Sequence, residues 1–284
     1  MVSIKRRLVQ LAAAFAFNSH VAGFFRGTIY RGNLKQVCLP VLNCYSCPGA
    51  IGSCPVGSLQ AVASLSTFYF SFYVTGFLAL VGVFTGRLAC GWLCPFGLIQ
   101  ELLYRIPSPK YLLPDWTRFV KYFILVIPVL LLPPMFAGDI NPGTPFFCKW
   151  LCPAGTLEAA IPLSVTNSGI RGALGWLFTW RISWLAAILI FVILIKRGFC
   201  LVLCPLGAFY SLFNGISFLK ISRDPERCNT CGKCAVICPL RLPERTMNHP
   251  ECTRCLKCVH NCPTGALKWR LQITEGCASV HVKN

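Results

Sequence analysis

Residues 90–101 read CGWLCPFGLIQE and hold two cysteines separated by three residues, the second followed by proline. The same C-x3-C-P-x-G pattern recurs at 148–159 (CKWLCPAGTLEA) and 200–211 (CLVLCPLGAFYS). Proline fits the first turn of a helix, because the N–H that it lacks would be unpaired there anyway. Each copy therefore predicts a helix that begins directly after its second cysteine.

An incomplete fourth copy lies earlier, in NCYSCPGAIGSCPVGSLQ (43–60). Cys54 begins the same C-P-x-G sequence, but Ala50 stands where the first cysteine of the motif belongs. Cys44 and Cys47 lie just upstream. We expect one of these two cysteines to replace the missing one, and the spacing leaves both open.

The start of a helix suits a negatively charged group. Free amide N–H groups and the positive end of the helix dipole meet there, and they lower the pKa of a cysteine thiol. The glycine of the motif permits close approach of the backbone. Gln60, Gln100 and Glu158 occupy one equivalent position in the following turn of three copies. Because a single C-x3-C supplies only two thiolates, a centre with four ligands requires two motifs.

Apolar residues dominate the first three quarters of the chain. Of all 284 residues 55% are hydrophobic and 13% are charged, a balance that predicts a membrane protein. Four stretches have the roughly 20 mostly apolar residues that a spanning helix needs. They are residues 8–25, 61–84, 119–137 and 176–195. We therefore predict an all-α membrane domain with four transmembrane helices, the first of them uncleaved.

Loop charges predict the orientation, because Lys and Arg collect on the cytoplasmic side. Residues 5–7 (Lys-Arg-Arg) precede the first predicted span, and Lys196 and Arg197 follow the fourth. Both termini of this multi-pass protein are therefore expected in the cytoplasm, with residues 1–219 as the transmembrane domain. The alternative is a fifth span over 199–219, which would place the C-terminal domain outside.

From residue 220 onward the chain is polar and rich in cysteine. Residues 228–239 (CNTCGKCAVICP) and 252–263 (CTRCLKCVHNCP) each repeat the C-x2-C-x2-C-x3-C-P run of bacterial ferredoxins, whose fourth cysteine crosses to the other cluster. Residues 220–284 are therefore predicted to form a small α+β ferredoxin domain with two [4Fe-4S] clusters. One cluster is expected to take Cys228, Cys231, Cys234 and Cys262, and the other Cys252, Cys255, Cys258 and Cys238.

Zinc and nucleic acid are weaker interpretations. Pairs of the C-x2-C type also bind zinc, but four cysteines so close in sequence crowd a tetrahedral zinc site. The formal charge of +18 suggests nucleic acid, yet the basic residues are scattered between apolar spans, and thiolate clusters would offset part of the charge. We expect iron and no nucleic acid, and the basic tail favours an acidic partner or anionic lipid.

Topology predicts how the membrane motifs pair. If one motif follows each span, the copies alternate between the two sides of the membrane. The inner copies supply Cys90, Cys94, Cys200 and Cys204 for one [4Fe-4S] cluster. The outer copies supply Cys54, Cys148 and Cys152, with either Cys44 or Cys47, for a second. The two halves then form parallel repeats about an axis along the membrane normal.

Four further residues near the motifs have less certain assignments. Arg87, Trp92 and Lys149 have the chemistry to donate to sulfurs or to contact a quinone head group. Anchoring at the membrane interface is the preferred interpretation for all three. Cys38 fits no copy of the motif and stays unassigned.

The chain resembles the membrane-bound polyferredoxins related to NapH, the quinol dehydrogenase subunit of periplasmic nitrate reduction, and to the membrane part of NosR. The similarity rests most specifically on 90–97, 200–207 and 228–263. It implies a prokaryotic plasma (inner) membrane and electron exchange with the quinone pool or a partner enzyme. The chain departs from the usual pattern by a third C-x3-C-P motif, from Cys148, and by the cysteine-rich variant at 44–57.

Electron transfer is the function that these features predict. The sequence contains no paired carboxylates, nucleophile with base or nucleotide loop, so we expect no catalytic residues and a relay between a cytoplasmic redox protein and the membrane or its outer face. About 30 Å of hydrocarbon is too wide for one transfer, so a cluster near each face is expected. Lipid and redox proteins on one or both faces are the expected partners. The alternatives are a quinol dehydrogenase with a quinone site beside a cluster, and a redox assembly factor for a respiratory enzyme.

Overall fold

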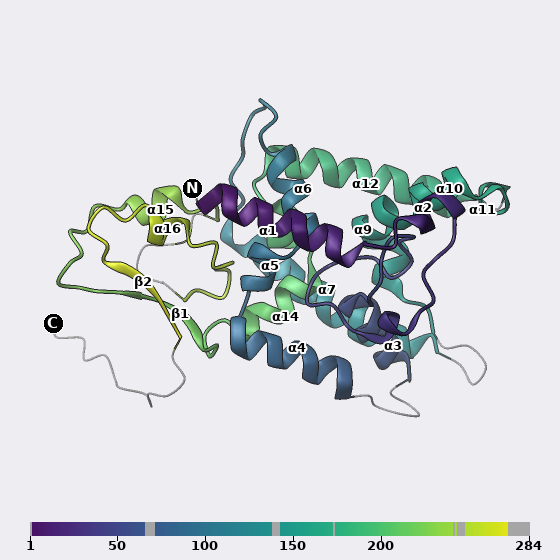
Figure 1. Ribbon diagram of the computed structural model, residues 1–284, viewed down its shortest axis with the longest axis horizontal. Helices are drawn as coiled ribbons and strands as arrows, with labels where there is room; N and C mark the ends of the chain where they lie inside the picture. The colour runs from purple at the N-terminus through teal and green to yellow at the C-terminus, as the bar shows by residue number, and fades with distance from the viewer. Residues whose placement is uncertain are drawn as a thin grey trace.

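The computed structural model describes residues 2–65, 72–137, 143–172, 174–240, 242 and 248–271. Across these ranges the chain is mostly helical. Its sheet has two antiparallel strands, β1 (Leu219–Arg223) and β2 (Leu267–Leu271), with Ile221 opposite Trp269. Figure 1 shows this sheet at one end of an elongated molecule, the end at which helix α1 starts.

Helices begin at all four prolines of the C-P-x-G motifs, as predicted. These helices are α3 (Pro55–Leu65), α6 (Pro95–Leu103), α9 (Pro153–Gly155) and α14 (Pro205–Phe213). Helix α9 continues through η5 (Thr156–Ala160) into α10 (Ile161–Thr166). The prediction is confirmed in every copy because the rule is local: a proline that cannot donate costs least in the first turn.

Short helical turns carry the first cysteine of each complete motif. They are α5 (Leu88–Trp92), η4 (Phe147–Leu151) and α13 (Gly198–Val202). After each turn the chain extends for one residue, the second cysteine, before the next helix begins. The stretch 199–219, considered as a fifth span, is not one continuous helix, because it forms α13, α14 and the start of β1.

Two helices are long and apolar enough to cross a membrane, judged by length and composition. One is α12 (Trp176–Leu194), which matches the predicted span over 176–195. The other covers Asp115–Met135 and matches the span predicted over 119–137. It consists of four consecutive helical segments, η2 (Asp115–Phe119), α7 (Val120–Ile124), η3 (Leu125–Leu131) and α8 (Leu132–Met135). Pro128 lies inside η3, where the helix widens to π geometry.

The first two predicted spans differ from the structure. Residues 8–25 are not one helix, because α1 (Val2–Phe17) ends before α2 (Ala22–Arg26) begins. The side chain of Asn18 bonds the carbonyl of Ala14 at 3.0 Å where α1 ends. In the stretch 61–84, α3 and the apolar α4 (Phe72–Thr85) are described, and residues 66–71 between them lie outside the described part. Four spans in two repeats stay a prediction.

A buried ion-pair group joins α1 to α6. Glu101 on α6 accepts from Arg6 on α1 and, at 2.8 Å, from Arg197, which precedes α13. Both arginines have no exposed surface, and Glu101 keeps 7%. Removing one partner from such a group costs about 3–5 kcal/mol, because a charge is left buried and unpaired.

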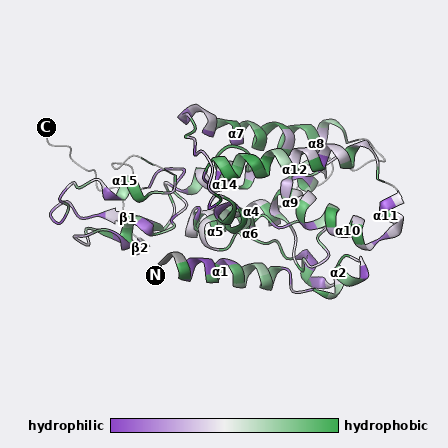
Figure 2. Ribbon diagram, turned by 90° about the horizontal axis from the view of Figure 1, so that it is seen from above, coloured by the Kyte–Doolittle hydropathy of each residue, from purple (hydrophilic) through white to green (hydrophobic). Residues whose placement is uncertain are grey.

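The remaining helices complete the two ends of the molecule. They are η1 (Asn33–Gln36), α11 (Ser168–Gly172), α15 (Lys233–Ile237) and α16 (Lys257–His260). Both views place α15 with the sheet at one end, and α2, α10 and α11 at the other (Figures 1 and 2). Green apolar residues concentrate on the helices between these ends in Figure 2. The elongated helical part therefore has the apolar surface, and the cysteine-rich sheet domain is polar.

Candidate iron-sulfur sites

Two complete motifs meet around one small cavity. Its cysteines are Cys90, Cys94, Cys200 and Cys204. The unfilled space that they surround is about 10 Å³. All four cysteines are buried, and apolar side chains such as Phe96 and Phe199 close the wall. We call this site the small cavity.

The other two motifs meet around a much larger cavity of about 700 Å³. Its cysteines are Cys44, Cys54, Cys148 and Cys152. Gly57 and Gly155 also line it, and a β-carbon on Gly57 would lie 3.9 Å from the sulfur of Cys148. The motif glycines therefore keep this space open beside the thiols. We call this site the large cavity.

Of the two cysteines that the spacing left open, the structure places Cys44 on the wall of the large cavity. A β-carbon on Gly155 would lie 3.8 Å from its sulfur. Cys47 lines neither cavity; its thiol lies 3.6 Å from the side-chain oxygen of Asn18. Cys38 is also buried and donates to the carbonyl of Leu39 at 3.8 Å.

Backbone amides point at the second cysteine of each motif. The N–H of Gly155 donates to the sulfur of Cys152 at 3.4 Å, and Gly207 does the same for Cys204 at 3.4 Å. The glycine N–H groups of the other two copies act on Cys54 and Cys94 in the same way. Donors in this position stabilise a thiolate and therefore a bound anionic cluster.

A glutamine joins the two motifs of each pair. Gln60 donates its side-chain N–H to the sulfur of Cys148 at 3.1 Å, and Gln100 donates to the sulfur of Cys200 at 3.0 Å. The amide of Gln60 is oriented by its oxygen, which accepts from the N–H of Phe147 at 3.0 Å. Both glutamines are fully buried. The sequence alignment of the copies located this position, but it gave no indication of the partner sulfur.

The tail cysteines form two groups. Cys228, Cys231, Cys234 and Cys262 line a third cavity of about 30 Å³, and we call them the distal group. Cys231 is exposed. Cys238, Cys252, Cys255 and Cys258 are mutual electrostatic neighbours, and we call them the proximal group. Each group combines three cysteines of one run with the fourth of the other, the crossing arrangement of two-cluster ferredoxins.

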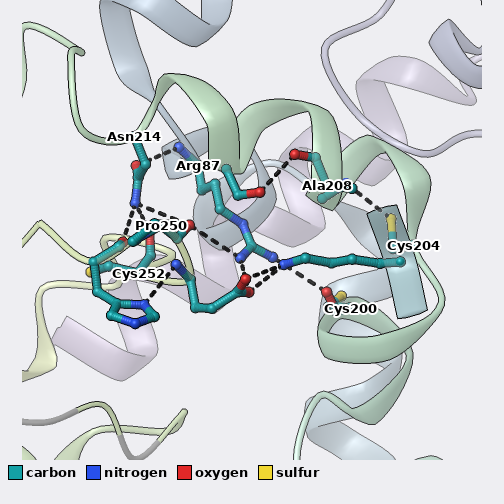
Figure 3. A network of polar contacts seen from close by, with 12 residues as sticks. Arg87, Cys200, Cys204, Ala208, Asn214, Pro250 and Cys252 are labelled. Carbon is teal, nitrogen blue, oxygen red and sulfur yellow. Dashed lines mark hydrogen bonds and ion pairs between the residues drawn. The ribbon is translucent and has the colours of Figure 1, made fainter. Parts of the chain in front are cut away.

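Buried charges connect the proximal group to the small cavity (Figure 3). Glu251, the residue before Cys252, accepts from Arg87 at 2.5 Å and also from Lys121. Arg87 donates in turn to the carbonyl of Cys200 at 3.3 Å. Burial alone would raise the pKa of Glu251, but Arg87 and Lys121 more than offset this and hold it below its ordinary value. The carboxylate therefore stays charged between two cations.

The assignment of Arg87 as an interface anchor is wrong, because this side chain is fully buried. Sequence reasoning also missed its partner, since nothing local relates Glu251 to a residue 164 positions earlier. Trp92 does not face lipid with its N–H either, because it donates to the carbonyl of Arg254 at 3.1 Å. Lys149 lines the large cavity.

Further hydrogen bonds fix the loop that carries Cys252. Asn214, at the end of α14, donates to the carbonyls of His249 at 2.7 Å and Cys252 at 2.9 Å, and it accepts from the N–H of Arg87 at 3.2 Å (Figure 3). A β-carbon on Gly91 would collide with the carbonyl of Thr253. The tail therefore packs against the helical part through Asn214 and Gly91 as well as through Arg87.

Burial favours the neutral thiol form of Cys148, Cys252 and Cys258. Burial, helped by Cys54, raises the pKa of Cys148 to about 12. Burial, helped by neighbouring cysteines, raises the pKa of Cys252 to about 11 and that of Cys258 to about 12. Binding of a cluster must therefore release the protons of these thiols, and nearby positive charge must compensate the negative charge of the thiolates. Arg87 and Arg197 provide positive charge next to Cys200.

The residues fit iron-sulfur clusters by their donor chemistry. Each membrane cavity offers four thiols, amide donors to sulfur and a glycine cradle or a buried cation. Within the described ranges no three His, Cys, Asp or Glu side chains converge closely enough to share a single metal ion. A bound [4Fe-4S] cluster supplies one-electron redox chemistry, with a potential set by its charge, hydrogen bonds and exposure to solvent.

Comparison with known proteins agrees with this chemistry. The family described as a 4Fe-4S binding domain matches residues 67–114, 142–164 and 176–223. The ferredoxin-type protein NapH of Escherichia coli is 26% identical over 219 residues, which cover 72% of this chain and 67% of NapH. The chain is similar to NapH and contains a 4Fe-4S binding domain. This confirms the resemblance, and with it an iron-sulfur electron-transfer function of the ferredoxin type.

Other relatives extend the match of this NapH-like protein. The methylamine utilization ferredoxin-type protein MauN of Methylobacillus flagellatus is 27% identical over an alignment of 297 positions, which covers 98% of this chain and 93% of MauN. The putative electron transport protein YccM of Escherichia coli is 28% identical over 200 residues, and the chain spans 52% of its length. No solved structure matches. The relatives and the two apolar helices indicate a membrane association.

Proposed function

We propose that the chain relays electrons along four [4Fe-4S] clusters in series. The order is distal group, proximal group, small cavity and large cavity. The observation that carries this order is the bond from Glu251 through Arg87 to Cys200, because it ties the proximal group directly to the small cavity. An electron passes from one site to the next with no proton and no co-reactant.

Each of the four sites holds one cluster. The distal group and the proximal group each hold one cluster in the tail. The small cavity and the large cavity each hold one in the helical part, with Cys44 rather than Cys47 as the fourth ligand of the large cavity. Gln60 and Gln100 orient one thiolate in each membrane site and stabilise its charge.

The soluble electron partner docks at the distal group. Cys231 is exposed there, and Arg223 and Lys233 line the same cavity. These cations favour an acidic redox protein. The start of α1 lies at the same end of the molecule, so the helical part inserts in the inner membrane with this end in the cytoplasm (Figure 1). Lys5, Arg6 and Arg7 on α1 agree with that orientation.

Iron and acid-labile sulfide analysis of the purified protein, with EPR of the reduced form, tests the proposal. We expect about 16 irons per chain, four for each cluster. Cys204→Ala and Cys152→Ala should each remove the signal of one membrane site and leave the tail signals intact. Only two clusters in the intact protein, both assigned to the tail, would refute the series.

The size of the large cavity favours a second function, quinol oxidation or quinone reduction beside that site. At about 700 Å³ it has the volume of a small-molecule pocket. Lys149 and Arg181 line it with mostly apolar neighbours, and both could contact a quinone oxygen. Reduction of the clusters by a short-chain quinol, compared between the intact protein and Arg181→Met, is the test. Absence of any reduction would leave the four-cluster relay as the function.

A further inference from the structure

The two membrane cavities share a wall. Leu42 lines both of them, Val41 lines the small cavity, and Cys44 lines the large cavity. Val41 and Leu42 are 1% and 2% exposed, and Asn43 between Leu42 and Cys44 is fully buried. A single stretch of chain outside helices and strands, residues 40–44, therefore separates the two sites. We call it the bridge segment.

Adjacent backbone amides of the bridge segment point to opposite sites. The N–H of Leu42 interacts with the sulfur of Cys94, and the N–H of Asn43 interacts with the sulfur of Cys54. These two amides belong to adjacent residues, and one residue spans at most about 3.6 Å. Two cavities that share the side chain of Leu42 lie much closer together than the roughly 30 Å of a hydrocarbon layer.

The motifs themselves hold the bridge segment at both ends. The residues six positions after the second cysteine are Gln60, Gln100, Glu158 and Tyr210. The two glutamines bond cysteine sulfurs, as described above. The other two bond the bridge: Glu158 accepts from the N–H of Cys44 at 2.8 Å, and Tyr210 donates to the carbonyl of Pro40 at 3.1 Å. Tyr210 is fully buried.

We infer that the bridge segment is the electron-transfer path between the two membrane sites, and that Glu158 and Tyr210 are the positioning residues that hold it there. This inference rests on the proposed function, because it requires a cluster in each cavity. One electron leaves the site that contains Cys94 and enters the site that contains Cys54. A path through covalent bonds and hydrogen bonds carries an electron better than an equal distance through space.

Close sites predict magnetic interaction. In the fully reduced full-length protein, we expect the EPR spectrum of the small cavity to be split or broadened by the large cavity. In Cys54→Ala, which disrupts only the large cavity, that spectrum should narrow, while the contribution of the two tail clusters stays constant. An unchanged small-cavity spectrum in Cys54→Ala would overturn the inference and leave the proposed function standing. Absence of both membrane-site signals from the intact protein would overturn both.

Tyr210→Phe tests the positioning role. It removes one hydroxyl from the bridge and leaves every cysteine in place. We expect full iron content with a reduced splitting, because Pro40 loses its anchor. The matched control is Tyr122→Phe, which removes a hydroxyl bonded to Ser211 on the same helix at 2.7 Å and does not touch the bridge. Equal splittings in Tyr210→Phe and Tyr122→Phe would show that Tyr210 has no positioning role.

Discussion

The small cavity and the large cavity are built from the same motif but differ in their surroundings. Two complete motifs close the small one to about 10 Å³, with Arg87 on its wall. The large one uses an incomplete motif and a loop cysteine, and it remains about 700 Å³ in volume, with half-buried Glu158 bonded to the N–H of Cys44. The comparison shows that the shared motif provides ligands and amide donors, whereas the size of each cavity and the charge beside it differ between the copies.

The largest expected effect concerns the ligand that distinguishes the two sites. Cys44→Ala should remove about four irons per chain and the large-cavity EPR signal, because a cluster needs its fourth thiolate. Cys47→Ala is the matched control, three positions along the same loop and off the cavity wall. Iron analysis of both variants checks this. Loss of iron from Cys47→Ala with retention in Cys44→Ala would reverse the assignment.

Arg87→Met should affect the small cavity alone among the membrane sites. It leaves Glu251 with one cation, which costs about 3–5 kcal/mol of stability for a buried pair. It should also lower the small-cavity potential by on the order of 100 mV, since a buried positive charge favours the reduced cluster. Redox titration followed by EPR measures the shift. Arg118→Met, which disrupts the more exposed pair with Asp115, should change neither quantity.

Access to solvent should make the large cavity the point of oxidation. A small hydrophilic oxidant such as ferricyanide has room to enter the large cavity but not the small one. When the reduced protein is mixed with oxidant and freeze-quenched, we expect both EPR signals to disappear together, because the bridge segment passes electrons from the small cavity to the large one. In Cys54→Ala, which disrupts the large cavity, the small-cavity signal should persist longer. Loss of that signal as fast as in the intact protein would contradict the difference in access.

The smallest expected effects are shifts in reduction potential that should be equal for the two cavities. Gln100→Leu should lower the potential of the small cavity, and Gln60→Leu that of the large cavity, each by about 40 mV, the value of one hydrogen bond of about 1 kcal/mol. Each change should leave the other site unaltered. Potentials measured by EPR titration decide this, and Gln10→Leu is a buried control that bonds backbone carbonyls rather than sulfur. A shift of both sites by either variant would argue against a local effect.

Much of the site was predictable because it depends on local rules. Proline and cysteine spacing predicted four helix starts, and each helix begins where expected. The apolar lengths of 119–137 and 176–195 predicted the two long helices. The span over 8–25 was not predictable in this way, because α1 ends at Phe17 and its buried Arg6 pairs with Glu101, 95 residues away.

The sequence by itself determined the cysteine sets, the helix starts and the iron-sulfur class, since each depends on residues that are close along the chain. Only the tertiary structure decided that Cys44 lies on a cavity wall, that Arg87 meets Glu251, and that both membrane cavities lie against Leu42. These contacts join residues far apart in sequence. Spacing limits what a motif can bind, but packing selects which motifs become neighbours and how much space is left between them.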